Sequence, residues 1–173
     1  PGFIDQHVHI TGGGGQQGYA SLVPEVTMSE LVACGTTTVL GMLGTDGFAK
    51  ELTTLYAKAK AIDDDGLSAY MLTSYYGLPT KTLMNSVADD LIFIDKVIGC
   101  KLAMSDDRSP FPTEQEILRI IHQVRLGGFT SGKGGILHIH LGALPEGIEP
   151  LLKYCSSLSY TDILSVSYSS DTY

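Results

Sequence analysis

Two hydrophobic patterns alternate along most of the chain. Short, nearly continuous apolar runs that are typical of buried strands lie at 1–10, 37–43, 68–73, 100–104 and 135–141. Between them, apolar residues recur every three or four positions in runs at 28–34, 48–63, 87–98, 114–126 and 148–155. That spacing is typical of helices with one buried face. Strands that alternate with helices in this way predict parallel βα units and an α/β fold.

Two architectures are commonly built from parallel βα units: the doubly wound sheet and the (β/α)8 barrel of the TIM type. No glycine-rich phosphate-binding motif follows any predicted strand, which argues against a nucleotide site. A barrel usually needs about 250 residues, so these 173 residues would supply only about the first five of its eight βα units.

The two ends of the chain differ in character from the rest. The chain begins with Pro1 at the edge of a strand and not with methionine, so we expect a fragment of a longer protein. Residues 1–155 would form the partial barrel, and 156–173 a Ser- and Tyr-rich tail of uncertain structure. Within this tail only Ile163, Leu164 and Val166 suggest a further strand.

Composition narrows the classes of partner. The chain is 43% hydrophobic and 17% charged, as expected of a folded domain, and its net charge of −8 argues against nucleic acid or an anionic membrane as partner. Its three cysteines have no pairable or metal-binding spacing, which suits a reducing compartment. No apolar run is long enough to span a bilayer, and no secretory signal is present. We therefore expect a cytoplasmic location.

The stretch PGFIDQHVHI at 1–10 carries the first candidate site. His7 and His9 are two positions apart, so in a strand both side chains lie on the same face. Two adjacent imidazoles make a poor apolar core but a good half of a metal site. The alternative is one exposed histidine beside one that is hydrogen-bonded in the core. The GGGG run at 12–15 would let the backbone approach a ligand, or would serve as a flexible loop.

Further polar residues follow the other predicted strands, at the edge where sites gather in parallel α/β folds. They include Thr45, Tyr76 and Arg108. The fifth strand carries a second pair, His138 and His140, of which His140 is the better candidate ligand because it is nearer the strand end. His122 lies within a predicted helix and is interpreted as a surface or packing residue.

Lys101 lies within the apolar strand IGCKLAMS, where a bare ammonium would be costly to bury. Three explanations remain open. The side chain reaches solvent at the strand end, forms an ion pair with Asp106 or Asp107, or reacts with CO2 to give a carbamate that can bridge two metals. Histidines at the same edge favour the third explanation, because imidazoles and a bridging carboxylate suit zinc.

These residues resemble the amidohydrolase superfamily of metal-dependent (β/α)8 barrels. PGFIDQHVH matches its first-strand motif PGxIDxHxH. The chain is most similar to the isoaspartyl (β-aspartyl) dipeptidases, through segments that run as far as about residue 155: VPEV, GMLGTD, IDKVIGCK and SDDRS.

The resemblance implies a metallopeptidase with two zinc ions per subunit, held by His7, His9, the carbamate of Lys101, and His140. A hydroxide that bridges the metals would attack the isopeptide carbonyl, and Tyr76 would stabilise the oxyanion. Arg108 would bind a substrate carboxylate, and the pocket would be lined by Gly14, Gly15, Gln16 and Thr45. The implied partners are a small dipeptide substrate and further copies of the chain in a homo-oligomer such as an octamer.

The chain departs from the family pattern in two respects. Gln16 occupies the position of a glutamate that pairs with the α-ammonium of the substrate. A further histidine ligand, an aspartate that is both ligand and proton shuttle, and a second arginine have no counterpart; the expected histidine region reads SVSYSSDTY. The small β domain of the family is also absent. We therefore expect the 173 residues alone to be inactive.

Two other functions remain open. One is a different amidohydrolase that opens cyclic amides, similar to a hydantoinase or dihydroorotase. The other is a truncated, non-catalytic amidohydrolase-like protein. Tyr76 and Arg108 favour the dipeptidase over the first alternative, and the intact set of His7, His9, Lys101 and His140 argues against the second.

Overall fold

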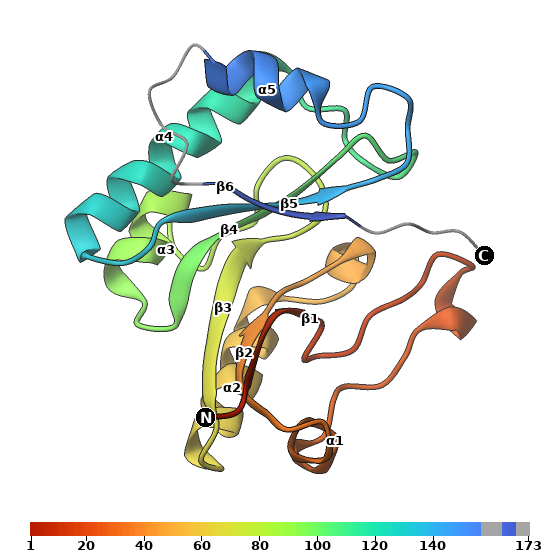
Figure 1. Ribbon diagram of the computed structural model, residues 1–173, viewed down its shortest axis with the longest axis vertical. Coiled ribbons are helices and arrows are strands. Elements are labelled where there is room, and N and C mark those ends of the chain that lie inside the picture. Colours follow the sequence, from red (N-terminus) through yellow and green to blue (C-terminus); the bar gives the residue numbers. More distant parts are fainter. Residues whose placement is uncertain (157–163, 169–173) are drawn as a thin grey trace.

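The computed structural model describes residues 1–156 and 164–168, with side chains through Tyr154, and shows one curved sheet with helices packed on its outer side (Figure 1). The sheet is six-stranded, and its strands follow one another in sequence order with every neighbouring pair parallel. The strands are β1 (Phe3–Val8), β2 (Thr36–Gly41), β3 (Ser68–Ser74), β4 (Val97–Met104), β5 (Ile136–Leu141) and β6 (Leu164–Tyr168).

The helices connect successive strands. They are α1 (Met28–Ala33), α2 (Leu52–Asp64), α3 (Val87–Phe93), α4 (Glu114–Ser131) and α5 (Glu149–Ser156), with short 3-10 turns at Tyr19–Ser21 and Thr45–Phe48. A doubly wound sheet would change strand order and carry helices on both faces. The sequential order and the outer helices identify the predicted partial (β/α)8 barrel, with β6 extending the five expected strands.

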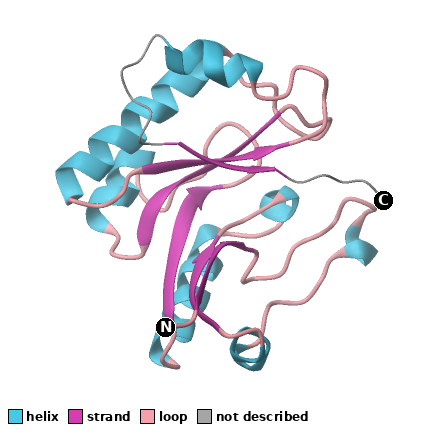
Figure 2. Ribbon diagram, in the orientation of Figure 1, coloured by secondary structure: helices cyan, strands magenta, loops and turns pink. Residues whose placement is uncertain are grey.

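The connections differ in length at the two edges of the sheet. Those from α1, α2, α3 and α4 to the next strand are short, whereas those that leave β1, β3 and β4 are long loops (Figure 2). In a barrel of this type the loops after the strands build the active site. The sequence-predicted site residues belong to this edge.

Local signals in the sequence set several helix starts. The hydroxyls of Thr27 and Thr113 each accept a hydrogen bond from the backbone N–H three residues later, and Glu30 and Glu116 reciprocate. Each pair forms a capping box, which satisfies two backbone donors that a helix start leaves open. Ser86 caps α3 by accepting from the Asp89 N–H at 3.0 Å.

Several predicted boundaries are wrong. The apolar spacing predicted a helix over 87–98, but α3 ends at Phe93, and Val97 begins β4. Val97 is fully buried in the sheet, so apolar residues of the next strand continued the helical spacing by chance. The second helix was predicted from 48 but begins at Leu52, because a 3-10 turn occupies Thr45–Phe48.

Gly127 and Gly128 were predicted to end a helix, but α4 continues to Ser131 and is capped by Gly132 in the left-handed conformation. Both glycines are packing positions. A Cβ on Gly127 would lie 2.7 Å from Leu91 Cβ, and one on Gly128 would lie 2.7 Å from Gly135 Cα. These contacts bring α4 close to α3 and to the start of β5.

The main core fills the space between the helices and the sheet. Its fully buried members include Val39, Leu55, Leu91, Ile117 and Ile139. His122 is exposed on α4, as predicted. None of the described helices has the length and apolarity needed to cross a membrane. The predicted tail at 156–173 lies outside the described residues except for Ser156 at the end of α5 and the strand β6.

Candidate active site

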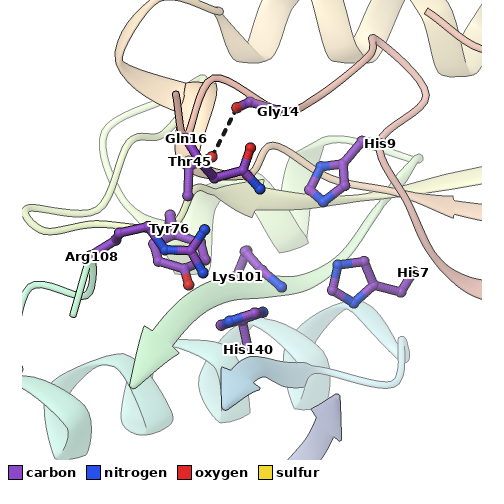
Figure 3. A pocket seen from close by; sticks show the side chains of 10 residues that line it. His7, His9, Gly14, Gln16, Thr45, Tyr76, Lys101, Arg108 and His140 are labelled. Carbon is purple, nitrogen blue, oxygen red and sulfur yellow. Dashed lines mark hydrogen bonds between the residues drawn. The ribbon is translucent and has the colours of Figure 1, made fainter. Parts of the chain in front are cut away.

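A cavity of about 180 Å³ opens where β1 to β5 end, and most of the predicted site residues line it. Figure 3 shows their side chains converging from separate strands and loops. The lining consists of His7, His9, Gly14, Gln16, Gly44, Thr45, Tyr76, Lys101, Arg108 and His140. Gly15, which was also predicted, is not among the described residues that line the cavity.

His7 and His9 come from the end of β1, and the centroids of their rings are 5.3 Å apart. The Nδ1 of His9 lies 3.1 Å from the carbonyl oxygen of Met42, and a carbonyl can only accept, so this nitrogen carries the proton. The lone pair of His9 is therefore on Nε2. Burial and the nearby Lys101 lower the pKa of His9. A neutral imidazole with an available lone pair is a metal ligand.

Gly44 makes room for the His9 ring. A Cβ at this position would lie 2.6 Å from His9 Cε1, so only glycine fits there without displacing the ring. Sequence reasoning missed this lining residue, although it belongs to the GMLGTD segment that the resemblance rests on.

Lys101 is the largest fully buried side chain of the described residues and is only 1% exposed. Its Nζ has no hydrogen-bond partner among the described residues, so two of the three explanations are wrong: the side chain neither reaches solvent nor forms an ion pair with Asp106 or Asp107. Burial lowers the pKa of Lys101 to about 7, so a large fraction of the amine is neutral at neutral pH. A neutral amine is the form that reacts with CO2.

The two histidines of β5 have different surroundings. His138 is paired with Lys101 in the sheet register, and its Nε2 lies 3.1 Å from His7 Nδ1. Burial and Lys101 lower the pKa values of both His138 and His7 to about 3. His140 faces the cavity, whereas His138 contacts a histidine that lines it. This arrangement suits His140 as the ligand, which the sequence favoured, and His138 as a residue that orients His7.

Tyr76 and Arg108 approach the cavity from the loops after β3 and β4. Both loops start at a serine in the left-handed conformation, Ser74 with φ 68° and Ser105 with φ 53°. The Tyr76 ring centroid lies 4.9 Å from that of His140, and the guanidinium carbon of Arg108 lies 5.7 Å from the Tyr76 ring centroid. The site therefore places a phenol and a cation next to a candidate metal ligand.

The loop after β1 closes the opposite side of the cavity. The hydroxyl of Thr45 donates to the carbonyl oxygen of Gly14 at 3.0 Å, which ties this loop to the one after β2 (Figure 3). Gly14 has φ 81°, and a Cβ there would lie 2.4 Å from the carbonyl oxygen of Ser21, so glycine is required at this turn. Gln16 contributes its uncharged side chain to the lining.

The donor set fits a metal only if Lys101 takes part. Among the described residues, no three His, Cys, Asp or Glu side chains lie close enough together to form a metal site by themselves. Lys101, however, places a buried and unpartnered nitrogen among His7, His9 and His140 (Figure 3). A carbamate on this nitrogen would supply two anionic oxygens to the three imidazoles, and such a set suits zinc.

Asp106 is the second residue whose place in the site the sequence did not reveal. It was noted as polar and near a strand end, but only as a partner for Lys101. In the structure it binds Arg108 and His140 instead. Its position in SDDRS next to Arg108 was the available signal.

No protein-family model matches the chain. Solved structures that are similar to it include two of the β-aspartyl dipeptidase of the thermophilic, keratin-degrading Fervidobacterium islandicum AW-1. Each has 45% sequence identity and a TM-score of 0.93 over 96% of this chain, and one contains the dipeptide β-Asp-Leu. The chain spans 45–46% of the length of those proteins. The predicted resemblance and the predicted partial barrel are both confirmed.

Proposed function

We propose that this chain, which is similar over 96% of its length to a β-aspartyl dipeptidase, supplies part of the active site of a metal-dependent isoaspartyl dipeptidase. The observation that carries the proposal is the convergence of Tyr76, Arg108 and the set around Lys101 on one cavity. A cation next to a phenol and a candidate metal site suits a substrate with a carboxylate beside a scissile amide.

The proposed ligands are His7, His9, Lys101 as its carbamate, and His140. Two zinc ions bound there would supply an activated water and polarise the scissile carbonyl. Histidines with lowered pKa values keep their lone pairs at neutral pH. Burial keeps Lys101 in the form that takes up CO2.

The remaining residues bind and orient the dipeptide. Arg108 binds the substrate carboxylate through paired N–H donors, and Tyr76 donates its hydroxyl proton to the oxygen that becomes negative in the transition state. Gln16 accepts a hydrogen bond from the substrate ammonium without a charge of its own. In this arrangement the amide carbonyl would lie between Tyr76 and Lys101.

The proposed hydrolytic activity can be tested with the full-length protein. Full-length protein should contain about two zinc ions per subunit and hydrolyse β-Asp-Leu, and bicarbonate should be needed when metal-free protein is reconstituted. Arg108→Met should lower kcat/KM for β-Asp-Leu by about 10- to 100-fold, because a charge-assisted hydrogen bond contributes about 1.5–3 kcal/mol. Coupled detection of released leucine measures hydrolysis and kcat/KM, and metal analysis measures the zinc content.

Arg119→Met is the matched control, because Arg119 is exposed on α4 and belongs to no part of the cavity lining. It should leave kcat/KM unchanged. Absence of β-Asp-Leu hydrolysis by zinc-loaded protein contradicts the proposal. Equal activity of Arg108→Met and wild type would remove Arg108 from the substrate site.

A further inference from the structure

Asp106 contacts two residues of the proposed site at once, Arg108 and His140. It accepts hydrogen bonds from Nε and Nη2 of Arg108 at 2.8 and 2.7 Å, and from the Arg108 backbone N–H at 2.8 Å. The Nε2 of His140 lies 3.1 Å from the same carboxylate. One side chain therefore contacts both the proposed substrate-binding arginine and a proposed metal ligand.

The carboxylate of Asp106 is held in place by its surroundings. Asp106 is 5% exposed, and it follows Ser105, whose hydroxyl donates to the carbonyl oxygen of Gly147 at 2.6 Å. Gly142, just after β5, passes so close that a Cβ on it would lie 2.4 Å from Asp106 Cβ. The end of β5 and the loop after β4 thus fix the position of Asp106 relative to His140.

The charge state of Asp106 suits this role. Its oxygens receive three N–H donors of Arg108, one from the backbone and two from the guanidinium, and such a paired guanidinium–carboxylate contact is made by the ionised carboxylate. The residue is therefore an anion that only accepts hydrogen bonds. A carboxylate fixed in this way determines the orientation of each group that donates to it.

The hydrogen bonds to Asp106 leave other nitrogen atoms of Arg108 and His140 available for substrate and metal. A guanidinium has five N–H donors in a rigid fork, and Asp106 engages two of them through Nε and Nη2. The edge between the two terminal nitrogens is then directed away from Asp106. A proton on Nε2 of His140 is held by the carboxylate, which places the lone pair on Nδ1.

We propose that Asp106 is a positioning residue shared by two functions of the site, which aims Arg108 at the substrate carboxylate and fixes the orientation of His140 toward the metal. The proposal rests on the proposed function and extends it to a residue that contacts neither metal nor substrate. Binding of metal and binding of substrate would then both depend on one side chain.

Asp106→Asn in the full-length protein tests the proposal. An asparagine has one acceptor oxygen, and its N–H2 group would replace the second, so it cannot accept at both positions: Oδ1 receives the backbone N–H and Nε of Arg108, and Oδ2 receives Nη2 of Arg108 and lies next to Nε2 of His140. At saturating zinc, KM for β-Asp-Leu should rise about 10-fold or more while kcat changes less, because Arg108 binds substrate in the ground state as well. Equilibrium dialysis should show zinc affinity reduced about 10- to 100-fold, as when other carboxylates that orient ligand histidines are removed.

Asp107→Asn is the matched control. Asp107 is adjacent in sequence, its side chain is 86% exposed, and its Oδ1 lies 3.6 Å from Arg108 Nε. It should change neither KM nor zinc affinity by more than about twofold, because exposed ion pairs contribute little. Asp106→Glu keeps the charge, should show both defects at reduced size, and supplies the test if circular dichroism shows that D106N is not folded.

The outcomes separate the proposal from the proposed function. In an Arg108→Met background, D106N should raise KM no further, since its effect on KM acts through Arg108. A folded D106N with wild-type KM or wild-type zinc affinity overturns the shared role. If the wild type binds zinc but does not hydrolyse β-Asp-Leu, the proposed function is wrong. The zinc affinity of D106N then still tests whether Asp106 orients His140. If the wild type binds no zinc, both fail.

Discussion

The ionisable side chains buried in the described part of the chain follow two different rules. Asp106 and Asp90 are buried with several hydrogen-bond donors each, which offsets the cost of removing a carboxylate from water. Lys101 is buried with none. A buried group without a partner destabilises the fold unless the functional state supplies one, so Lys101 is the residue at which the site departs from ordinary packing.

Asp63 and Lys96 form a similar hydrogen-bonded pair away from the site, although Asp63 is only partly buried. The Lys96 ammonium and the Ala69 backbone N–H both donate to Asp63, and these hydrogen bonds lower its pKa. Asp63→Asn should reduce the free energy of unfolding by about 1–2 kcal/mol at pH 7. A lowered folded-state pKa stabilises the protein above the unfolded pKa of about 4, and this contribution is lost as the pH falls further.

Urea titrations at pH 7 and pH 3 would measure the change. The difference between D63N and wild type should shrink at the lower pH. Asp64→Asn is the control, since Asp64 is exposed at the next position, and it should have no effect at either pH. A loss of stability that is the same at both pH values would show that the charge of Asp63 is not the cause.

At the scale of elements, two glycines allow helix α4 to pack closely against its neighbours. Gly127 and Gly128 lie within the helix at its contacts with α3 and with the start of β5, although glycine is a poor helix former. Lys133, just after α4, donates to the carbonyl oxygen of Leu91 in α3 at 2.7 Å and to that of Val97 at the start of β4 at 3.1 Å. Close approach of these elements, and not helix propensity, explains the two glycines.

Gly127→Ala should therefore lower stability. Alanine favours a helix by about 1 kcal/mol over glycine, but overpacking against Leu91 Cβ at 2.7 Å should cost about 1–3 kcal/mol. We expect a lower melting temperature in calorimetry. Thr130→Ala, at an exposed position of the same helix, should not lower it. A higher melting temperature for G127A would mean that α3 and α4 separate easily.

At the scale of the molecule, β1 and β6 form the two edges of the described sheet, and no pairing joins them. Phe3 and Ile4 of β1 are 72% and 66% exposed, which is unusual for apolar strand residues of a barrel. Open parallel edges with exposed apolar side chains are surfaces that associate with other chains. The proposed site lies inside this curved sheet.

The 173-residue chain by itself should not hydrolyse β-Asp-Leu. The histidine, aspartate and second arginine that the dipeptidase resemblance requires have no counterpart in its sequence, so the metal ligands and the proton shuttle would be incomplete. A leucine-release assay on the zinc-loaded chain, with the full-length protein as positive control, measures this. Turnover by the chain alone would show that the residues present suffice.

The sequence alone determined the class of fold and most of the lining of the site. Hydrophobic periodicity depends on local geometry, so the alternation of strands and helices could be predicted, as could the capping residue Ser86. Because His7 and His9 are two positions apart in a strand, they could be predicted to lie on one face. Tyr76 and Arg108 could be predicted as site residues because they follow strand ends. Boundaries such as the end of α3 could not be predicted, because a buried strand and the buried face of a helix are built from the same apolar residue types.

Tertiary structure decided which groups are partners. Sequence left Lys101 with three explanations, and only the packed sheet shows that its nitrogen is buried away from Asp106 and Asp107. It also decided that Asp106 binds Arg108 and His140 and that Gly44 makes room for His9. Burial and hydrogen bonding arise from contacts between segments far apart in the chain, and no local pattern of residues encodes those distances.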